Sequence, residues 1–256
     1  MNDNLKIEVA VSCSWFQKRL CWMLSSILQQ EGDLPEIIFN VAYPKNNGNP
    51  NTESVCDFFK DKGINIKESI YNDEINMQQR GLVRNSQVAE TNADWILFAD
   101  TDMVYHPLFF ADLKSQLMGE LKDCDLCLCA SRISLGKDFC KNYFNNEDKT
   151  EYPCIINNVE KIVSKWPVYR ITRPGGAGYF QLANVQVIKD KNNGLYVNPK
   201  RCRDRRSVES YHKAKSDMQF RKSIGGRMAI KTYPQYHLNH ERDNTEGLKS
   251  HLTIQR

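Results

Sequence analysis

The chain has 256 residues, of which 41% are hydrophobic and 26% charged, with a net charge of +4. This balance supplies enough apolar material for the core of one large α/β domain. The charge is too small for a nucleic-acid-binding protein, which would carry a concentrated basic face, so we expect no nucleic-acid partner.

The ends and cysteines of the chain bear on its location. The amino terminus is polar and acidic rather than signal-like, and no apolar run reaches the roughly 18 residues of a transmembrane helix. Nine cysteines without a secretion signal indicate reduced thiols, so we expect a cytoplasmic protein. The basic run 200–206 predicts a solvated loop, or alternatively a loop that meets phosphates or the surface of an anionic membrane.

Cys124, Cys127 and Cys129 have the close spacing of zinc ligands. No second Cys or His pair follows at the spacing of a zinc site, however, and residues 125–130 have the character of a strand. We therefore expect a buried strand with small apolar thiols.

The first half of the chain alternates strands and helices. The predicted strands are 7–12, 36–42, 64–70, 95–99 and 125–131, and the predicted helices are 19–30, 52–62, 74–91 and 107–121. Thr52 is the expected cap of the second helix. Strand 95–99 is the most apolar and predicts a central strand buried on both faces. This alternation predicts a mostly parallel, Rossmann-like sheet flanked by helices.

The second half has weaker signals and predicts a smaller, mixed structure. Residues 136–170 appear irregular apart from a short helix at 159–164; strands are expected at 179–188 and 228–233, and a helix at 217–223. The simplest organisation is a single domain over 1–256. A nucleotide-binding half, about 1–131, and an acceptor-shaping half, about 132–256, would share one sheet.

Asp100 and Asp102 follow the predicted central strand directly. Two carboxylates at the end of a buried strand repel each other and lose hydration, which a cation would offset. Their oxygens suit Mn²⁺ or Mg²⁺, and open α/β sheets bind ligands at the carboxyl ends of their strands. The alternative is a pair of turn or capping aspartates before the helix at Pro107.

Several segments, taken in order, resemble the GT-A-fold glycosyltransferases, especially those of family 2. They are Val11–Leu20, Leu24–Gln30, Pro35–Ile38, Arg80–Asn85 and Ala93–Asp102. The match covers residues 7 to about 110 and is patchier afterwards. One departure concerns the nucleotide base, because Asn40–Tyr43 lacks the Asp that the family often carries after its second strand.

The resemblance implies roles for residues of the first half. Asp102 would bind the metal directly, and Asp100 would contact the ribose, or the metal through water. Ser12, Cys13 and Ser14 would line the base and ribose pocket. Arg84 and Asn85 would lie near the nucleotide, where a guanidinium suits phosphate oxygens; the alternative for Arg84 is an exposed position on the helix surface.

The second half offers further matches to the family. Gly175 and Gly176 would approach the donor sugar, or form an ordinary turn before a strand. Asp217 would be the general base that takes the proton of the acceptor hydroxyl in an inverting transfer, although Ser216 replaces the usual Glu. The alternative for Asp217 is a helix cap. His240, or else His237, would complete the metal site.

Together these matches predict an inverting, metal-dependent glycosyltransferase of the hexosyltransferase type, as in polysaccharide biosynthesis. The implied donor is a nucleotide sugar, with a uridine diphosphate sugar as the commonest choice in the family. The acceptor is a glycan, glycoconjugate or other hydroxyl compound, and peripheral contact with a membrane is compatible with the basic run.

Two other functions fit parts of the pattern. Asp100-Thr-Asp102-Met-Val104 matches the motif of haloacid-dehalogenase-like phosphatases, in which Asp100 would be the nucleophile. Such motifs normally follow the first strand, whereas three predicted strands precede this one. A non-catalytic GT-A relative that binds nucleotides or carbohydrates is the other alternative, because Ser216 departs from the family pattern.

Overall fold

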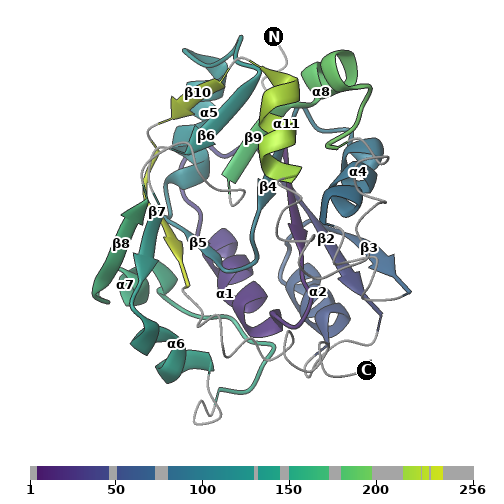
Figure 1. Ribbon diagram of the computed structural model, residues 1–256. Coiled ribbons are helices and arrows are strands. Elements are labelled where there is room, and N and C mark those ends of the chain that lie inside the picture. The colour runs from purple at the N-terminus through teal and green to yellow at the C-terminus, as the bar shows by residue number, and fades with distance from the viewer. Residues whose placement is uncertain are drawn as a thin grey trace, which may run out of the picture.

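The computed structural model describes residues 5–45, 51–72, 80–129, 132–144, 150–172, 180–197, 216–225, 227–230 and 232–238. These residues form a large sheet covered by helices and a smaller sheet beside it (Figure 1).

The large sheet contains seven strands in the order β10-β6-β9-β4-β1-β2-β3. Their bounds are β1 Lys6–Ser12, β2 Glu36–Pro44, β3 Ile66–Tyr71, β4 Trp95–Ala99, β6 Leu126–Cys129, β9 Phe180–Asn184 and β10 Arg227–Ile230. Strands β1 to β4 run parallel, β9 is antiparallel to both β4 and β6, and β10 is parallel to β6. The predicted mostly parallel sheet is confirmed, and it contains strands from both halves of the chain.

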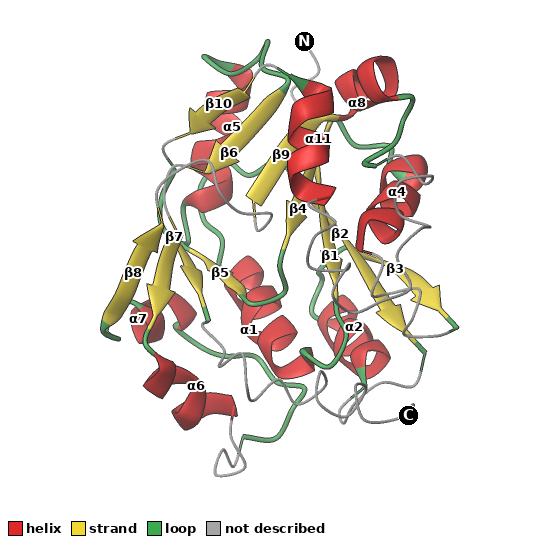
Figure 2. Ribbon diagram, viewed as in Figure 1, coloured by secondary structure: helices red, strands yellow, loops and turns green. Residues whose placement is uncertain are grey.

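Helices cover both faces of this sheet (Figure 2). They are α1 Gln17–Leu28, α2 Thr52–Asp61, α4 Arg80–Glu90, α5 Phe109–Met118, α8 Val185–Asn192 and α11 Ser216–Ile224. Side chains alternate between the faces of β1: Val9 packs in the cluster that contains α1, α2 and α5, and Ala10 in the cluster that contains α8 and α11. In the part of the chain described, no helix is both long and apolar enough to cross a bilayer.

The second sheet contains β5 Met103–Tyr105, β7 Arg132–Leu135, β8 Val168–Thr172 and β11 Gln235–His237, in the order β5-β11-β7-β8. Two helices accompany it, α6 Lys137–Phe144 and α7 Val159–Val163. The expectation that residues 136–170 are irregular apart from one helix was wrong, because α6 and most of β8 lie there. These short elements carry too few turns or alternations to give a clear period.

Two predicted boundaries need correction. Asn51, rather than Thr52, caps α2: its side chain accepts a hydrogen bond from the backbone N–H of Ser54 at 2.7 Å. Strand 179–188 ends at Asn184, whose side chain accepts from the N–H of Val187 and begins α8. In both cases an amide side chain satisfies N–H groups that have no partner inside the helix.

Six cysteines are seen as free thiols: Cys13, Cys21, Cys56, Cys124, Cys127 and Cys154. Cys124 and Cys127 are buried with their sulfur atoms 3.6 Å apart, which agrees with the prediction of apolar thiols in a buried strand. Among residues of the described ranges, no group of three His, Cys, Asp or Glu side chains could hold a metal.

The link between the two sheets positions the candidate site. Strand β4 ends at Ala99 and β5 begins at Met103, so Asp100 and Asp102 lie where the chain leaves the large sheet for the small one. All five residues of β4 are buried, as the apolar run predicts.

Phe39 tests the core of the large sheet. It is fully buried on β2, so Phe39→Ala is expected to lower the free energy of unfolding by about 3–5 kcal/mol through lost burial and a residual cavity. Ile70→Ala, at a strand position that is 53% exposed, should cost about 0.5 kcal/mol or less. Urea denaturation measures both; equal losses would contradict this account of the core.

Candidate functional site

Asp102 lies beside a histidine. Strand β11 pairs antiparallel with β5, and the N–H of Leu238 donates to the Asp102 carbonyl at 2.8 Å. This pairing brings Nε2 of His237 to 3.0 Å from Oδ2 of Asp102, and the Asp102 side chain is only 9% exposed. Of the two predicted histidines, His237 is therefore the one seen next to Asp102. His240 lies outside the described residues.

The chemistry of this pair suits a divalent cation. A carboxylate oxygen and an imidazole nitrogen are a donor set that Mn²⁺ accepts, and each ligand must be deprotonated to bind it. The described part of the site supplies two such groups, so the remaining ligands would come from Asp100, from water or from a bound diphosphate. The pair thus fits the predicted metal in ligand type.

Asp100 is more exposed and faces a cation. Its Oδ1 lies 3.7 Å from Nη1 of Arg80, and the two side chains are 33% and 59% exposed. Arg80 is four residues before Arg84 on α4, so both guanidinium groups lie on the same side of that helix. Such an open ion pair contributes little to stability, but it places a cation beside the end of β4.

Arg84 is buried and holds Asp217. Its Nη1 donates to Oδ1 of Asp217 and to the hydroxyl of Tyr196, both at 2.6 Å. The rings of Phe98 and Tyr196 lie 5.4 and 4.9 Å from the guanidinium carbon, a distance typical of cation–π contacts. The Arg84 side chain is 6% exposed, which rules out the exposed helix surface weighed for it.

Tyr196 is shared by two acceptors. Its hydroxyl lies 2.6 Å from Oε1 of Gln181 on β9 and 2.7 Å from Oδ1 of Asp217. Since a phenol has one O–H, it can donate to only one of these oxygens at a time. Burial raises the pKa of Tyr196 well above its ordinary value, so the hydroxyl keeps its proton at neutral pH.

Asp217 is held as a carboxylate. Burial by itself would raise its pKa, but the charge of Arg84 and the hydrogen bond from Tyr196 bring the pKa below its ordinary value. The side chain remains 40% exposed, so part of it still faces solvent. Asp217 therefore sits at the start of α11 as a charged, partly accessible group.

The loop after β1 has a buried and an open part. Cys13 is fully buried, its N–H donates to the Ala42 carbonyl at 2.8 Å, and burial raises the pKa of its thiol to about 11. Ser12 and Ser14 are partly exposed. Trp15 follows with a φ of 65°, an uncommon conformation for a residue other than glycine, and such strain often accompanies functional loops.

Asn85 holds the segment that carries Tyr196. Its side-chain amide donates to the Val197 carbonyl at 2.9 Å and accepts from the Val197 N–H at 2.9 Å. This double contact fixes the backbone next to Tyr196. Gly175 and Gly176 lie outside the described residues.

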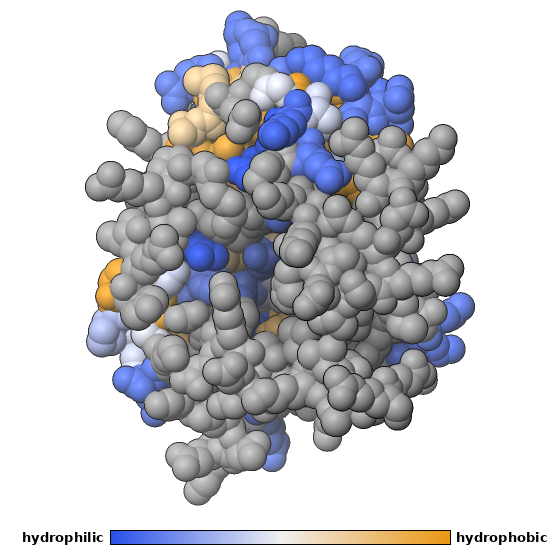
Figure 3. All heavy atoms as spheres, viewed as in Figure 1, coloured by the Kyte–Doolittle hydropathy of each residue, from blue (hydrophilic) through white to orange (hydrophobic). Residues whose placement is uncertain are grey.

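Described residues coloured as hydrophilic are visible at several separate places on the face shown in Figure 3. Some of them lie near the middle of this face, where β4 passes toward β5 in Figure 1.

Solved structures share the fold of this chain, and some of them are complexes with a nucleotide or a nucleotide sugar. TarS of S. aureus aligns with a TM-score of 0.57 and 14% identity over 92% of this chain and 37% of TarS. TarS in complex with UDP gives 0.57 and 13% over 92% and 61%. The mannosyltransferase PcManGT from Pyrobaculum calidifontis, in complex with GDP-Man and Mn²⁺, gives 0.57 and 9% over 93% and 58%.

This similarity establishes the fold. The chain has a glycosyltransferase fold of the GT-A type, as its sequence resemblance predicts. It spans between 37% and 61% of the length of these three solved chains. No protein-family model and no curated protein sequence matches it.

Sequence reasoning missed three residues of this site. Arg80 was noted only as part of a family segment, whereas Gln181 and Tyr196 were not singled out. Tyr196 follows a polar stretch and Gln181 lies within an apolar strand, so their proximity depends on the packing of the segment after α8 against β9. The buried Gln in the strand is the one feature that could have indicated a polar contact.

The Arg84–Asp217 pair makes stability depend on pH. Asp217→Asn removes the carboxylate from a buried guanidinium, and we expect a loss of about 1–3 kcal/mol at pH 7. Because the folded pKa of Asp217 is lowered, the contribution of the pair is complete above the ordinary Asp pKa of about 4 and disappears as the pH falls through the folded value.

Urea denaturation of both proteins between pH 7 and pH 2.5 checks this. The difference in stability should stay constant down to about pH 4 and then shrink. Asp57→Asn, at a side chain that is 63% exposed, is the control and should show almost no difference. A difference that persists undiminished in acid would contradict the assigned ion pair.

Proposed function

We propose that this chain is a metal-dependent, inverting glycosyltransferase that moves a sugar from a nucleotide sugar to a hydroxyl of a glycan or other acceptor. One observation carries the proposal: the 3.0 Å contact between Asp102 and His237 at the carboxyl end of the central strand of a glycosyltransferase fold. Mn²⁺ and GDP-Man in the complex of PcManGT support the same class of ligands.

Asp102 and His237 would hold the metal, with Asp100 near the ribose or linked to the metal through water. When bound, the metal supplies positive charge that stabilises the leaving diphosphate. Arg80 would add a second positive charge, because its largely exposed guanidinium lies beside Asp100. A diphosphate carries more negative charge than one carboxylate, so it would compete well for this arginine.

The nucleotide would lie along the loop after β1. Ser12 and Ser14 are partly exposed and can offer hydroxyl groups, whereas the buried Cys13 would contribute shape rather than a thiolate. Arg84 and Asn85 would support the nucleotide pocket indirectly, because Arg84 holds the Asp217 side chain and Asn85 holds the backbone at Val197. Gly175 and Gly176 remain proposed contacts of the donor sugar. A UDP-sugar is the first donor to test, supported by the UDP complex of TarS.

Asp217 would act as the general base. It is ionised at neutral pH and partly accessible, so it can accept the proton of the acceptor hydroxyl as that oxygen attacks the anomeric carbon. Its Oδ1 already accepts from Arg84 and Tyr196, which directs the second oxygen toward the acceptor. Once Asp217 has taken the proton, the Tyr196 O–H can turn to Gln181. In this arrangement Tyr196 and Arg84 are positioning residues.

Asp102→Asn tests the metal site. In the native protein, UDP should raise the melting temperature more with Mn²⁺ than without it, because a ligand of the folded state stabilises that state. Asp102→Asn should abolish this coupling. His237→Gln keeps a hydrogen-bonding group but removes the imidazole, so it should weaken Mn²⁺ binding by about tenfold or more. Mutation of residues that only support the ligands of a metal already costs about tenfold or more in affinity.

Asp190→Asn, at an exposed position of α8, is the matched control and should bind UDP with Mn²⁺ normally. Undiminished coupling in Asp102→Asn would refute the metal assignment. Transfer from a UDP- or GDP-sugar to a panel of acceptors then separates an enzyme from a non-catalytic binding relative.

Tyr196→Phe tests how Asp217 is positioned. The hydrogen bond from Tyr196 lowers the pKa of Asp217, so its removal should raise that pKa and move the acidic limb of the kcat–pH profile to higher pH. The KM for the donor should change by less than about twofold, because Tyr196 acts through the base. A profile with an unmoved acidic limb would exclude this role, even if the variant were slower.

A further inference from the structure

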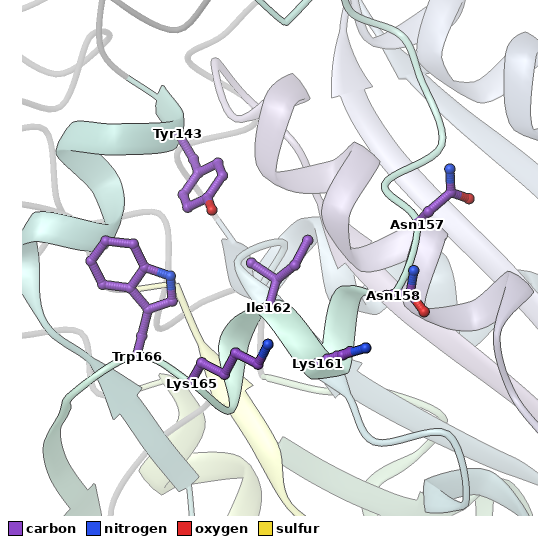
Figure 4. A pocket seen from close by; sticks show the side chains of 7 residues that line it. All are labelled: Tyr143, Asn157, Asn158, Lys161, Ile162, Lys165 and Trp166. Atoms are coloured by element: carbon purple, nitrogen blue, oxygen red, sulfur yellow. The ribbon is translucent and has the colours of Figure 1, made fainter.

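One pocket of the structure is lined by residues that do not belong to the proposed donor site. Figure 4 shows its seven lining residues, which are Tyr143, Asn157, Asn158, Lys161, Ile162, Lys165 and Trp166. They come from α6, from α7 and from the segments on either side of α7. The pocket has a volume of about 370 Å³, within the usual range for pockets that bind small molecules.

One wall of this pocket is aromatic and fixed. The rings of Tyr143 and Trp166 are 6.0 Å apart, and both pack on Phe139 at 4.8 and 5.3 Å. Trp22, a fully buried residue of α1, supports Phe139 and Tyr143 from behind at 5.2 and 5.0 Å. The wall is therefore held by the core and needs little ordering when a ligand binds.

The rest of the pocket is polar and positively charged. Lys161 and Lys165 are exposed, as are the amides of Asn157 and Asn158. None of the described residues that line the pocket is acidic. Glu160, the acidic neighbour of Lys161, instead accepts a hydrogen bond from the Tyr236 hydroxyl at 3.2 Å. Within the described lining, therefore, no carboxylate neutralises the two lysines.

From this combination we infer that the pocket binds an acidic sugar unit, a pyranose ring that carries a carboxylate or phosphate. An aromatic wall suits the apolar C–H face of a sugar, amides suit its hydroxyl groups, and lysines suit its acidic group. This site uses none of the residues of the proposed donor site, so it stands whether or not Asp102 binds a metal.

The pocket is nevertheless connected to the proposed active site. Glu160 of α7 contacts Tyr236, and the next residue of β11 is His237. The same short strand therefore contacts α7, which lines the pocket, and carries the partner of Asp102. An acidic glycan bound in this pocket would contact α7, which packs against the strand that carries His237 of the proposed donor site.

Saturation-transfer NMR with glucuronate, glucose and inorganic phosphate tests the inference on the intact chain. Glucuronate should bind with its ring protons closest to the protein. Glucose should bind at least about fivefold more weakly. Inorganic phosphate should not displace glucuronate when the two are present at equal concentration. The double variant Lys161→Ala/Lys165→Ala should reduce glucuronate binding to the level of glucose.

The control Lys122→Ala/Lys189→Ala removes the same charge from exposed positions elsewhere and should bind glucuronate normally. Trp166→Ala should abolish the signal of both sugars, and the lysine variants keep the test valid if that variant unfolds. Absence of sugar binding, equal glucuronate binding in both lysine variants, or full displacement by phosphate would overturn the inference. The coupling of UDP to Mn²⁺ should be unchanged in both lysine variants, which separates this result from the donor site.

Discussion

The buried guanidinium of Arg84 constrains much of this structure. A charge removed from water needs an opposite charge and hydrogen bonds, and Arg84 obtains these from Asp217 and Tyr196 while it packs against two aromatic rings. These partners come from β4, α11 and the segment after α8, which lie far from α4 in the sequence. The position of α11, and with it the proposed base, therefore depends on satisfying one charge on the face of the large sheet.

A second constraint acts where the chain leaves β4. The small sheet forms only if β11 returns to pair with β5, and this pairing sets His237 beside Asp102. The proposed metal ligand and its histidine thus come together through backbone hydrogen bonds of a three-residue strand. Arg84 therefore positions the proposed base, Asp217, and β11 independently positions His237 beside Asp102 at the proposed metal site.

The sequence predicted the features that have a local cause. The apolar run of β4 and the carboxylates that follow it gave the central strand and Asp102, and the alternation of elements gave the parallel sheet. It could not predict that Arg84 would be buried, because a helix surface gives no sign of Tyr196 and Asp217, more than 100 residues away. Short elements such as β5 and β11 were also missed, since three residues show no period. The contact between His237 and Asp102 similarly required the register of β11.

The two carboxylates differ in the kind of side chain that each one faces. Under the proposed function, the imidazole of His237 is itself a metal ligand, so Asp102 exchanges a hydrogen bond for a shared metal without losing its partner. Arg84 cannot lose its proton under such conditions, so Asp217 keeps a permanent positive neighbour and remains a carboxylate. Under the proposed function this difference suits the division of work. A site that loads a metal needs a partner that can itself become a ligand, whereas a base that must be ionised before each transfer needs a partner that keeps its positive charge.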